Sequence, residues 1–458
     1  MKKKFEHLIV ISFDSLSSFD VEKMKDLPNF CKLIKGSFFC PYVKTVYPSL
    51  TYPIHVSIIT GETPSVHGVT ANTLKQYNSN DPDWFWQREF IKCETLFDLA
   101  KANQMDVAAI LWPVTAKADI KYNMPEIFAN KKWQNQIIVS LLNGSPIFQI
   151  EMILKYGKIM KGKRQPELDN FIQKVVTDLI KNKKPELILA HFTDIDTNRH
   201  LFGTRSKEAD LALERHDKRI GELLMLLKKE KMLDNTALVV LGDHASLDTK
   251  FAVKLNPALE TLDFIKTDGK GCLLDYEFVV KSCGGSAYVY ENPRRTKSEA
   301  RRVQLIDFLE TYMEKGIIER IFNNKEVVAM GADPECFLML EAHEGYYFLD
   351  GFIGDVLEET EGKSAYGSHF TLSNHGYSYE KKNYGTVFSV TTDLRSMVNG
   401  IKEEDQVTPE ALETPESQVT PESQGTPESL RPFMNEEGEL EGMSITDEFN
   451  VLRELLFQ

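Results

Sequence analysis

The feature that most constrains the fold is a set of four short apolar runs, three of which are followed by polar side chains. They are HLIVISF at 7–13, VAAILW at 107–112, ELILAHF from Glu186 and TALVVLGD ending at Asp243. Short runs rich in β-branched residues are typical of strands buried on both faces of a parallel sheet. Helix-like segments alternate with them at about 20–35, 94–103, 166–182 and 206–231. The alternation predicts an α/β fold with a doubly wound, mainly parallel sheet sandwiched by helices.

Two regions depart from this alternation. Residues 246 to about 370 carry a possible strand at 285–291 and a helix-like stretch at 296–315, and we interpret them as a cap inserted into a domain of residues 1–400. After residue 400, Thr-Pro-Glu recurs with a period of six, beginning at 408, 414, 420 and 426. Proline at that spacing interrupts helices and central strands, so we expect residues 401–442 to form a disordered acidic linker.

The last segment, 443–458, has the apolar spacing of an amphipathic helix. The residues that give this spacing are Ile445, Phe449, Leu452 and Leu456. We expect this helix to dock on its own domain or on a second subunit.

Composition excludes some classes of protein. Of the formal net charge of −14, the 3 basic and 15 acidic residues of 401–458 supply −12, so the remaining chain is nearly neutral. No run approaches the roughly 20 apolar residues that span a bilayer. The lysine-rich start is followed by an apolar stretch that Asp14 interrupts, without a cleavage site, and the six cysteines contain no Cys-x-x-Cys pair. We expect a cytoplasmic protein with neither a membrane nor a nucleic-acid polymer as partner.

Polar residues follow three of the predicted strands. Asp14 ends the first, Asp196 and His200 follow ELILAHF, and Asp243-His244 ends the last. Each alone has an ordinary explanation, because an aspartate caps helices and an Asp–His pair four residues apart forms a salt bridge. At one edge of one sheet, however, three carboxylates repel one another unless a cation is present. The pattern therefore favours a metal site.

A second cluster is YPSLTYPIH at 47–55, followed by Thr60-Gly61, Pro64 and His67-Gly68. Thr51 precedes a proline by two residues and then an apolar run, which predicts the start of a helix. Its hydroxyl either caps that helix or faces a phosphate held by the helix N-terminus. We expect His55 and His67 to pack rather than to bind metal.

These motifs closely resemble those of the type I phosphodiesterase/nucleotide pyrophosphatase family, in the alkaline phosphatase superfamily. The resemblance runs from residue 7 to about 380 in the family's order. Besides the nucleophile segment it includes Asp14, Asp196-Thr-Asn-Arg-His200-x-x-Gly203, Leu241-Gly-Asp243-His244 and Asn374-His375-Gly376-Tyr377.

The resemblance implies a role for each matching residue. Thr51 matches the nucleophile, which would carry a phospho-threonine intermediate, and Asn72 matches a donor to a phosphoryl oxygen. Two divalent metal ions, usually zinc in the family, are implied. Their implied ligands are Asp14, Asp243, His244 and the Thr51 oxygen for one metal, and Asp196, His200 and His375 for the other.

The sequence departs from the family at a few positions. Arg199 replaces a glycine, Ala245-Ser246 replaces Gly-Met, and Ser49 replaces a threonine. For Arg199 we favour an orientation toward solvent over a charge near the site. Asp194 competes with Asp196 as a ligand, but its spacing to His200 fits less well.

Three aromatic residues, Tyr77, Trp84 and Trp86, follow Asn72 closely and either stack on a planar leaving group or form a packed loop wall. We expect a two-metal phosphohydrolase that cleaves phosphodiester or nucleotide pyrophosphate bonds in a small-molecule phosphate ester, with a nucleotide as one candidate. The alternatives are a phosphomonoesterase, a phosphonate hydrolase or a phosphoryl transferase on the same metal core. A non-enzymatic binding protein that kept the fold is the remaining alternative.

Overall fold

The computed structural model describes residues 4–79, 81–398, 426–435 and 438–457. Its centre is a seven-stranded sheet with the strand order β2-β17-β6-β1-β5-β3-β4. Only β17 runs antiparallel to its neighbours in this sheet. The strands are β1 (His7–Phe13), β2 (Phe38–Val43), β3 (Val107–Ile110), β4 (Tyr122–Met124), β5 (Leu187–Phe192), β6 (Thr236–Gly242) and β17 (Thr386–Thr391). The predicted α/β fold with a mainly parallel sheet is confirmed.

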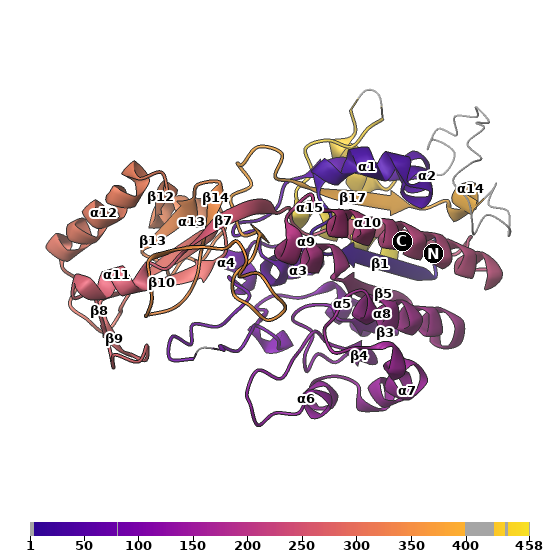
Figure 1. Ribbon diagram of the computed structural model, residues 1–458. Coiled ribbons are helices and arrows are strands. Elements are labelled where there is room, and N and C mark those ends of the chain that lie inside the picture. Colours follow the sequence, from indigo (N-terminus) through magenta and orange to yellow (C-terminus); the bar gives the residue numbers. More distant parts are fainter. Residues whose placement is uncertain (1–3, 80, 399–425, 436–437, 458) are drawn as a thin grey trace.

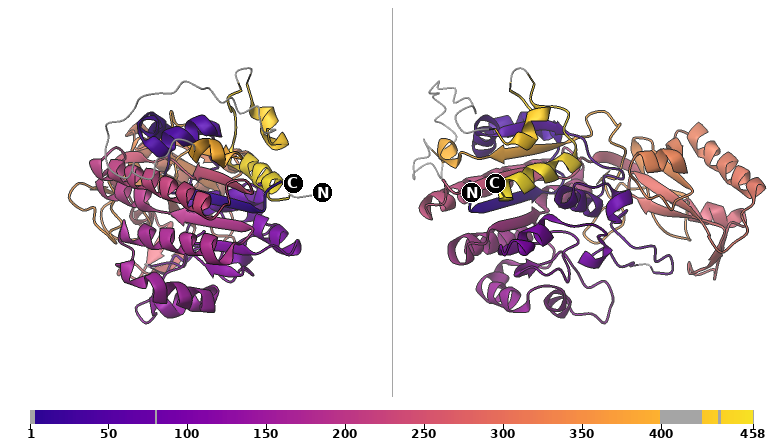
Figure 2. Two further views of the ribbon diagram at one scale, coloured as in Figure 1. Left: turned by 90° about the vertical axis from the view of Figure 1, so that its right-hand side faces the viewer. Right: turned by 180° about the vertical axis from the view of Figure 1, so that it is seen from behind.

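Helices cover both faces of this sheet (Figures 1 and 2). Successive side chains of β1 alternate between two cores, with Ile9 and Ile11 in one and Leu8 and Val10 in the other. The first core includes side chains of α1 (Val21–Asp26), α2 (Pro28–Gly36), α8 (Glu167–Asp178), α10 (Lys207–Lys229) and α14 (Leu394–Val398). The second includes side chains of α3 (Thr51–Thr60), α5 (Leu96–Ala102) and α15 (Ile445–Phe457).

Between β6 and β17 the chain leaves the central sheet and builds an insert with its own core. A four-stranded sheet has the order β10-β11-β13-β12, and β7 pairs with β14, β15 and β16. The strands of the insert are β7 (Leu247–Val253), β8 (Ile265–Thr267), β9 (Leu273–Tyr276), β10 (Phe278–Cys283), β11 (Ser286–Glu291), β12 (Ile318–Asn323), β13 (Leu338–Ala342), β14 (Gly345–Phe348), β15 (Leu357–Glu359) and β16 (Ser373–Asn374). Its helices are α11 (Asn256–Thr261), α12 (Glu299–Glu314) and α13 (Asn324–Ala329).

Four further helices lie in the connections of the main sheet: α4 (Pro64–His67), α6 (Gln136–Asn143), α7 (Pro146–Tyr156) and α9 (Asp194–Phe202). Within the described ranges, no helix is both long enough and apolar enough to cross a bilayer. The predicted linker at 401–442 falls mostly outside the described residues.

The C-terminal helix α15 packs on the same chain, against α3, α5 and β1. Val451, Leu452, Leu455 and Leu456 are buried in the core that it shares with α3. The ring of Phe449 lies so close to Gly61, the residue that ends α3, that a Cβ atom there would meet it at 2.9 Å. Of the two docking modes expected for this helix, the structure shows the contact with its own domain.

Candidate functional site

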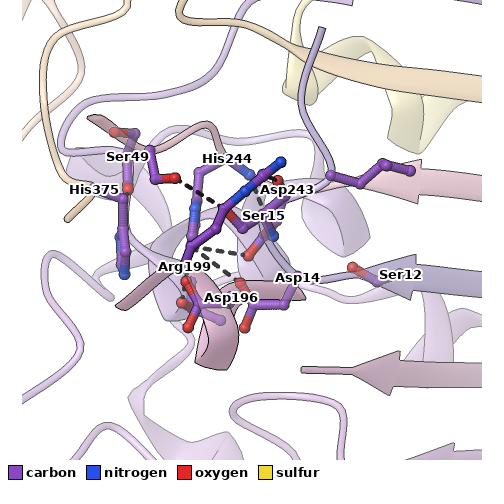
Figure 3. Close-up of polar contacts among 12 residues, drawn as sticks. Ser12, Asp14, Ser15, Ser49, Asp196, Arg199, Asp243, His244 and His375 are labelled. Carbon is purple, nitrogen blue, oxygen red and sulfur yellow. Dashed lines mark hydrogen bonds and ion pairs between the residues drawn. The ribbon is translucent and has the colours of Figure 1, made fainter. Parts of the chain in front are cut away.

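The predicted ligands converge at the carboxyl ends of the central strands (Figure 3). Asp14 directly follows β1, Asp243 directly follows β6, and α9 begins two residues after β5. Since β1 lies between β5 and β6 in the sheet, the three strand ends are neighbours. Parallel order alone therefore brings together carboxylates that are more than 200 residues apart in sequence.

One group of donors consists of Asp14, Asp243 and His244, whose ligand atoms lie within 4.8 Å of one another. His244 Nε2 is 3.2 Å from Asp14 Oδ1 and 3.4 Å from Asp243 Oδ2. The same nitrogen is 3.2 Å from Thr51 Oγ1. The sequence-predicted partners of the first metal thus lie around one point.

The second group is Asp196, His200 and His375, also within 4.8 Å. His200 Nε2 lies 3.3 Å from Asp196 Oδ1, one turn away on α9. The other ring nitrogens are held by main-chain carbonyls: His200 Nδ1 is 2.7 Å from Ser373 O, and His375 Nδ1 is 3.1 Å from Ser49 O. Such bonds fix the tautomer that presents Nε2 as a ligand.

The two groups adjoin each other, because the rings of His244 and His375 stack with centroids 3.8 Å apart. Together they place three carboxylates and three imidazoles in one region of low exposure. Burial, reinforced by the charges of Asp196 and Asp243, raises the pKa of Asp14 well above its usual range. Burial also raises the pKa of Asp243 to about 7 and lowers the pKa values of His244 and His375.

These donors fit divalent cations. Asp14 Oδ1, Asp196 Oδ1 and Asp243 Oδ2 are buried, yet none has a hydrogen-bond partner among the described residues. Buried oxygens without partners are rare, and each calls for an explanation such as an ion. Neutral imidazoles and carboxylates at this spacing are a donor set suited to zinc.

Thr51 is the first residue of α3, and its hydroxyl does not cap this helix. Leu50 occupies the N-cap position and no side chain caps the helix. Every residue of α3 is buried, so the hydroxyl is held rigidly beside His244. Asn72 lies close by, and its Oδ1 accepts a hydrogen bond of 3.0 Å from the main-chain N–H of Tyr52.

His191, which the sequence analysis left without a role, lies directly behind Asp14. Its Nε2 is 3.3 Å from Asp14 Oδ2, and its Nδ1 is 3.6 Å from Glu126 Oε2. Burial opposes protonation, but the contacts with these two carboxylates raise the pKa of His191 well above its usual value. A histidine inside the apolar run ELILAHF was the available signal, because a titratable side chain within a buried strand needs a partner.

The expectation that Arg199 points to solvent is wrong. Arg199 is buried and donates to the main-chain carbonyl of Ser15 and, at 2.6 Å, to Asp20 Oδ1. A buried guanidinium requires such partners, and they lie on the loop after β1. Asp194 is also engaged elsewhere, since Arg215 Nε approaches its Oδ2 to 2.6 Å.

The three predicted aromatic residues do not form one surface. Trp84 packs edge-on against Tyr52, next to the nucleophile, with ring centroids 5.1 Å apart. Trp86 is buried and packs on Phe128 at 5.3 Å. Tyr77 instead pairs with Tyr276 of the insert, beside a cavity of about 790 Å³. His55 and His67 are fully buried and lie within hydrogen-bonding distance of Ser12 and Ser57. His55 Nδ1 also lies 3.7 Å from Asp243 Oδ2, and with His191 these residues form a third group of candidate metal donors.

Residues 8–378 match the type I phosphodiesterase/nucleotide pyrophosphatase family. The chain belongs to this family. Among curated relatives it is 26% identical over 254 residues to an uncharacterized pyrophosphatase/phosphodiesterase of Schizosaccharomyces pombe. That match covers 53% of this chain and 45% of the relative. The chain is also 26% identical over 247 residues to human bis(5'-adenosyl)-triphosphatase, covering 52% of this chain and 47% of that one. The matches thus span about half the length of these relatives or less.

Solved structures of the family have the same fold over nearly the whole chain. Human ectonucleotide pyrophosphatase/phosphodiesterase 5 superimposes with a TM-score of 0.60 at 16% identity, covering 98% of this chain and 94% of that one. An inactive variant of the murine protein in complex with AMP superimposes with a TM-score of 0.58 at 16% identity, and the match covers 98% of this chain and 95% of that one. At this identity the likeness establishes the fold alone.

Proposed function

We propose that this protein hydrolyses a phosphodiester or nucleotide pyrophosphate bond, with Thr51 as the nucleophile at a site for two divalent cations. The observation that carries the proposal is the position of Thr51 Oγ1, 3.2 Å from His244 Nε2 and at the start of a buried helix. The hydroxyl does not cap the helix, so it is available for the reaction. Membership of a phosphodiesterase family supports the same reaction.

The proposed cations are zinc, because the donor set combines imidazoles and carboxylates. Asp196, His200 and His375 form the three-ligand arrangement that leaves a coordination position open for substrate. Asp14, Asp243 and His244 would hold the second cation, and Thr51 lies beside them. When bound, such cations stabilise an attacking alkoxide and a leaving oxygen.

The chain's own groups perform the remaining steps. Thr51 Oγ1 loses its proton to solvent and attacks phosphorus as the bond to the leaving alcohol or phosphate breaks, and the leaving oxygen takes up a proton from solvent. Water then cleaves the bond between phosphorus and Thr51 Oγ1 and restores the hydroxyl. Because Asn72 Oδ1 is occupied by the N–H of Tyr52, its Nδ2 is the atom left to donate to a phosphoryl oxygen. A donor of this kind contributes about 2–4 kcal/mol to the transition state.

The proposed substrate is a small phosphate ester, with a nucleotide as the best candidate. Trp84, which is half-buried and packs edge-on against the buried Tyr52 next to Thr51, offers an aromatic surface that suits a nucleobase. The names of the relatives point the same way, since one is a bis(5'-adenosyl)-triphosphatase and a structural neighbour was solved with AMP. Replacing Trp84 by alanine should lower kcat/KM more for a nitrophenyl nucleotide ester than for bis-nitrophenyl phosphate.

The decisive test compares rates on bis-nitrophenyl phosphate, nitrophenyl phosphate and a nitrophenyl nucleotide ester, with zinc present. We expect the diester substrates to be preferred, and Thr51→Ala to lower kcat by about a thousandfold or more. Ser65→Ala, which removes a hydroxyl from the neighbouring helix α4, is the matched control and should retain full activity. Preference for the monoester would overturn the proposed bond, and unchanged turnover by Thr51→Ala would overturn the nucleophile.

A further inference from the structure

The hairpin formed by α6 and α7, together with Trp133 before it, exposes an unusual amount of apolar surface. Trp133 is 83% exposed, Ile147 84% and Leu154 80%, although most large apolar side chains of this protein are buried. The large apolar side chains exposed here are those of Trp133, Ile137, Ile138, Leu142, Ile147 and Leu154. Large apolar side chains exposed together on one helical hairpin are typical of an interaction site.

The exposure follows from how the two helices are built. On α7, Ile147 and Leu154 lie seven residues apart on one face, whereas Phe148 and Met152 on the opposite face are buried. The helix therefore already uses one apolar face for the core and presents a second to the outside. On α6, no residue is buried at all.

The charge around this surface is opposite to that of the whole chain. Residues 129–165 contain 7 basic residues and 1 acidic residue, a net charge of +6 in a protein of net charge −14. Six of the seven basic residues are lysines. Lys132 and Lys158 are exposed, and among the described residues neither forms an ion pair. Lys131, Lys155 and Lys161 pair with Asp83, Asp178 and Glu167, whereas the exposed Lys132 and Lys158 keep the surroundings of the hairpin positive.

The hairpin lies at the edge of the molecule, beyond β4, the edge strand of the main sheet (Figures 1 and 2). The segment that leads into α6 is anchored to the rim of the active site. Phe128 packs on Trp84 with centroids 5.2 Å apart, and Asn130 Nδ2 donates to Asp83 Oδ1 at 2.9 Å. Whatever binds the hairpin is therefore held close to the active-site rim.

We propose that the α6–α7 hairpin docks on the surface of an anionic lipid bilayer. Exposed aliphatic residues and a tryptophan together with exposed lysines are the composition of helices that lie in the membrane interface. The helices are about 12 and 16 Å long, against about 30 Å for the hydrocarbon core, so they lie on the bilayer and do not cross it. This differs from the expectation of no membrane partner, which rested on the search for a spanning run.

A protein partner fits the same surface less well. Lysine is depleted in protein–protein interfaces, where arginine and tyrosine are enriched. A symmetric contact with a second copy would bring the positive segments that flank the two hairpins, residues 129–165 of each copy, close together. Negative lipid headgroups match both the apolar face and the charge.

The test uses the full chain and large unilamellar vesicles, either of phosphatidylcholine alone or of phosphatidylcholine with phosphatidylserine. We expect co-sedimentation with the anionic vesicles only, reversed by high salt. Ile147→Ser/Leu154→Ser should weaken partitioning by about tenfold or more, because each aliphatic side chain contributes on that scale. Leu274→Ser, an exposed apolar residue of the insert, is the matched control and should bind normally.

Trp133 supplies a second readout on the same protein. Anionic vesicles should shift its emission to shorter wavelength, and Trp133→Phe should abolish the shift while leaving most of the binding. Absence of sedimentation with anionic vesicles would overturn the proposal, as would equal binding of the double variant and the wild type. A concentration-dependent dimer that Ile147→Ser/Leu154→Ser disrupts would assign the surface to a second copy instead.

Discussion

The guanidinium of Arg199, on α9, donates a hydrogen bond to the main-chain carbonyl of Ser15, in the loop that follows β1. Each residue adjoins a proposed ligand, because Asp14 precedes Ser15 and His200 follows Arg199. Ser15 has a positive φ of 68° and donates its N–H to Asp243 Oδ1 at 2.8 Å. The conformation that aims Asp14 into the site therefore depends on α9 and on β6.

Replacing Arg199 by alanine should weaken metal binding and activity together. Asp20 would lose its buried partner and the Ser15 loop its anchor, and losses of outer-shell partners typically weaken metal affinity about 10- to 100-fold. Zinc affinity can be measured by competition with a chromophoric chelator, alongside kcat. Arg199→Lys should rescue poorly, because lysine lacks the planar fork that reaches several acceptors.

The matched control for this change is Arg205→Ala, which removes an exposed guanidinium that stacks on Phe19 beside Arg199. It should leave zinc affinity unchanged. Equal zinc affinity in the wild type and Arg199→Ala would show that the loop holds its shape without the arginine.

His191→Leu should also lower metal affinity, by about tenfold or more, because Asp14 Oδ2 would lose its neighbour at 3.3 Å. His191→Gln keeps a donor in the strand and should retain most of the affinity. Isothermal titration with zinc separates the two variants, and circular dichroism checks that both fold. If leucine and glutamine weakened binding equally, the contact with Asp14 would not be the cause.

The number of zinc ions bound per protein should show which donor group a substitution affects. The wild type should bind two zinc ions, whereas His375→Ala should lose the ion of its own group and keep the other. His343→Ala, an exposed histidine of the insert, is the control and should bind two. Zinc at about 100 times its Kd should stabilise the wild type by about 2.7 kcal/mol for each ion bound, seen as a rise in Tm. Two ions in His375→Ala would contradict the assignment.

The ligands near strand ends were predictable from sequence because strand order makes them neighbours. Asp14 and Asp243 end two apolar runs, and adjacency of those runs in a parallel sheet is enough to bring them together. The pairing of Asp196 with His200 follows from helical spacing, and α9 realises it. His375 needed the family resemblance, since β16 before it has only two residues.

Other features depend on contacts that no local pattern records. The local sequence of α9 favours an exposed position for Arg199, and its burial is explained only by the loop that contains Ser15, which packs against it. The apolar run that contains His191 correctly predicts a strand, but it does not indicate that Asp14 is the neighbour of His191. The antiparallel direction of β17 was likewise not evident, because a parallel and an antiparallel buried strand have the same apolar pattern.

Truncating Leu452 to alanine should destabilise the whole protein by about 2–5 kcal/mol, because this side chain is fully buried in the core shared by α15 and α3. Urea unfolding measures the loss. Leu211→Ala, an exposed leucine on α10, is the matched control and should change stability little. Equal unfolding midpoints for wild type and Leu452→Ala would show that α15 contributes nothing to the fold.

Glu448 on α15 predicts a pH dependence of stability. The side chain is fully buried and, among the described residues, neither carboxylate oxygen has a hydrogen-bond partner. Burial, with the charges of Asp447 and Asp243, raises the pKa of Glu448 well above its usual range. The unfolded state therefore loses this proton first, near pH 4.3, and stability falls as pH rises from there by up to about 1.4 kcal/mol per pH unit.

Glu448→Met should remove that contribution, so the variant should be more stable than the wild type, by a larger margin at pH 8 than at pH 5. Denaturant unfolding at both pH values measures the difference. Glu310→Met, at an exposed position of α12, provides the control and should show no such trend. A margin that shrinks toward pH 8 would mean that Glu448 is paired in solution.

The docking of α15 on α3 also sets the order in which the protein can mature on the ribosome. Thr51 and its helix are translated about 400 residues before the apolar residues that complete their core. Until residues 445–457 have left the exit tunnel, the α3 face of the sheet stays partly open to water. A nascent chain that already carries every proposed ligand therefore still lacks the surface that holds its nucleophile in place.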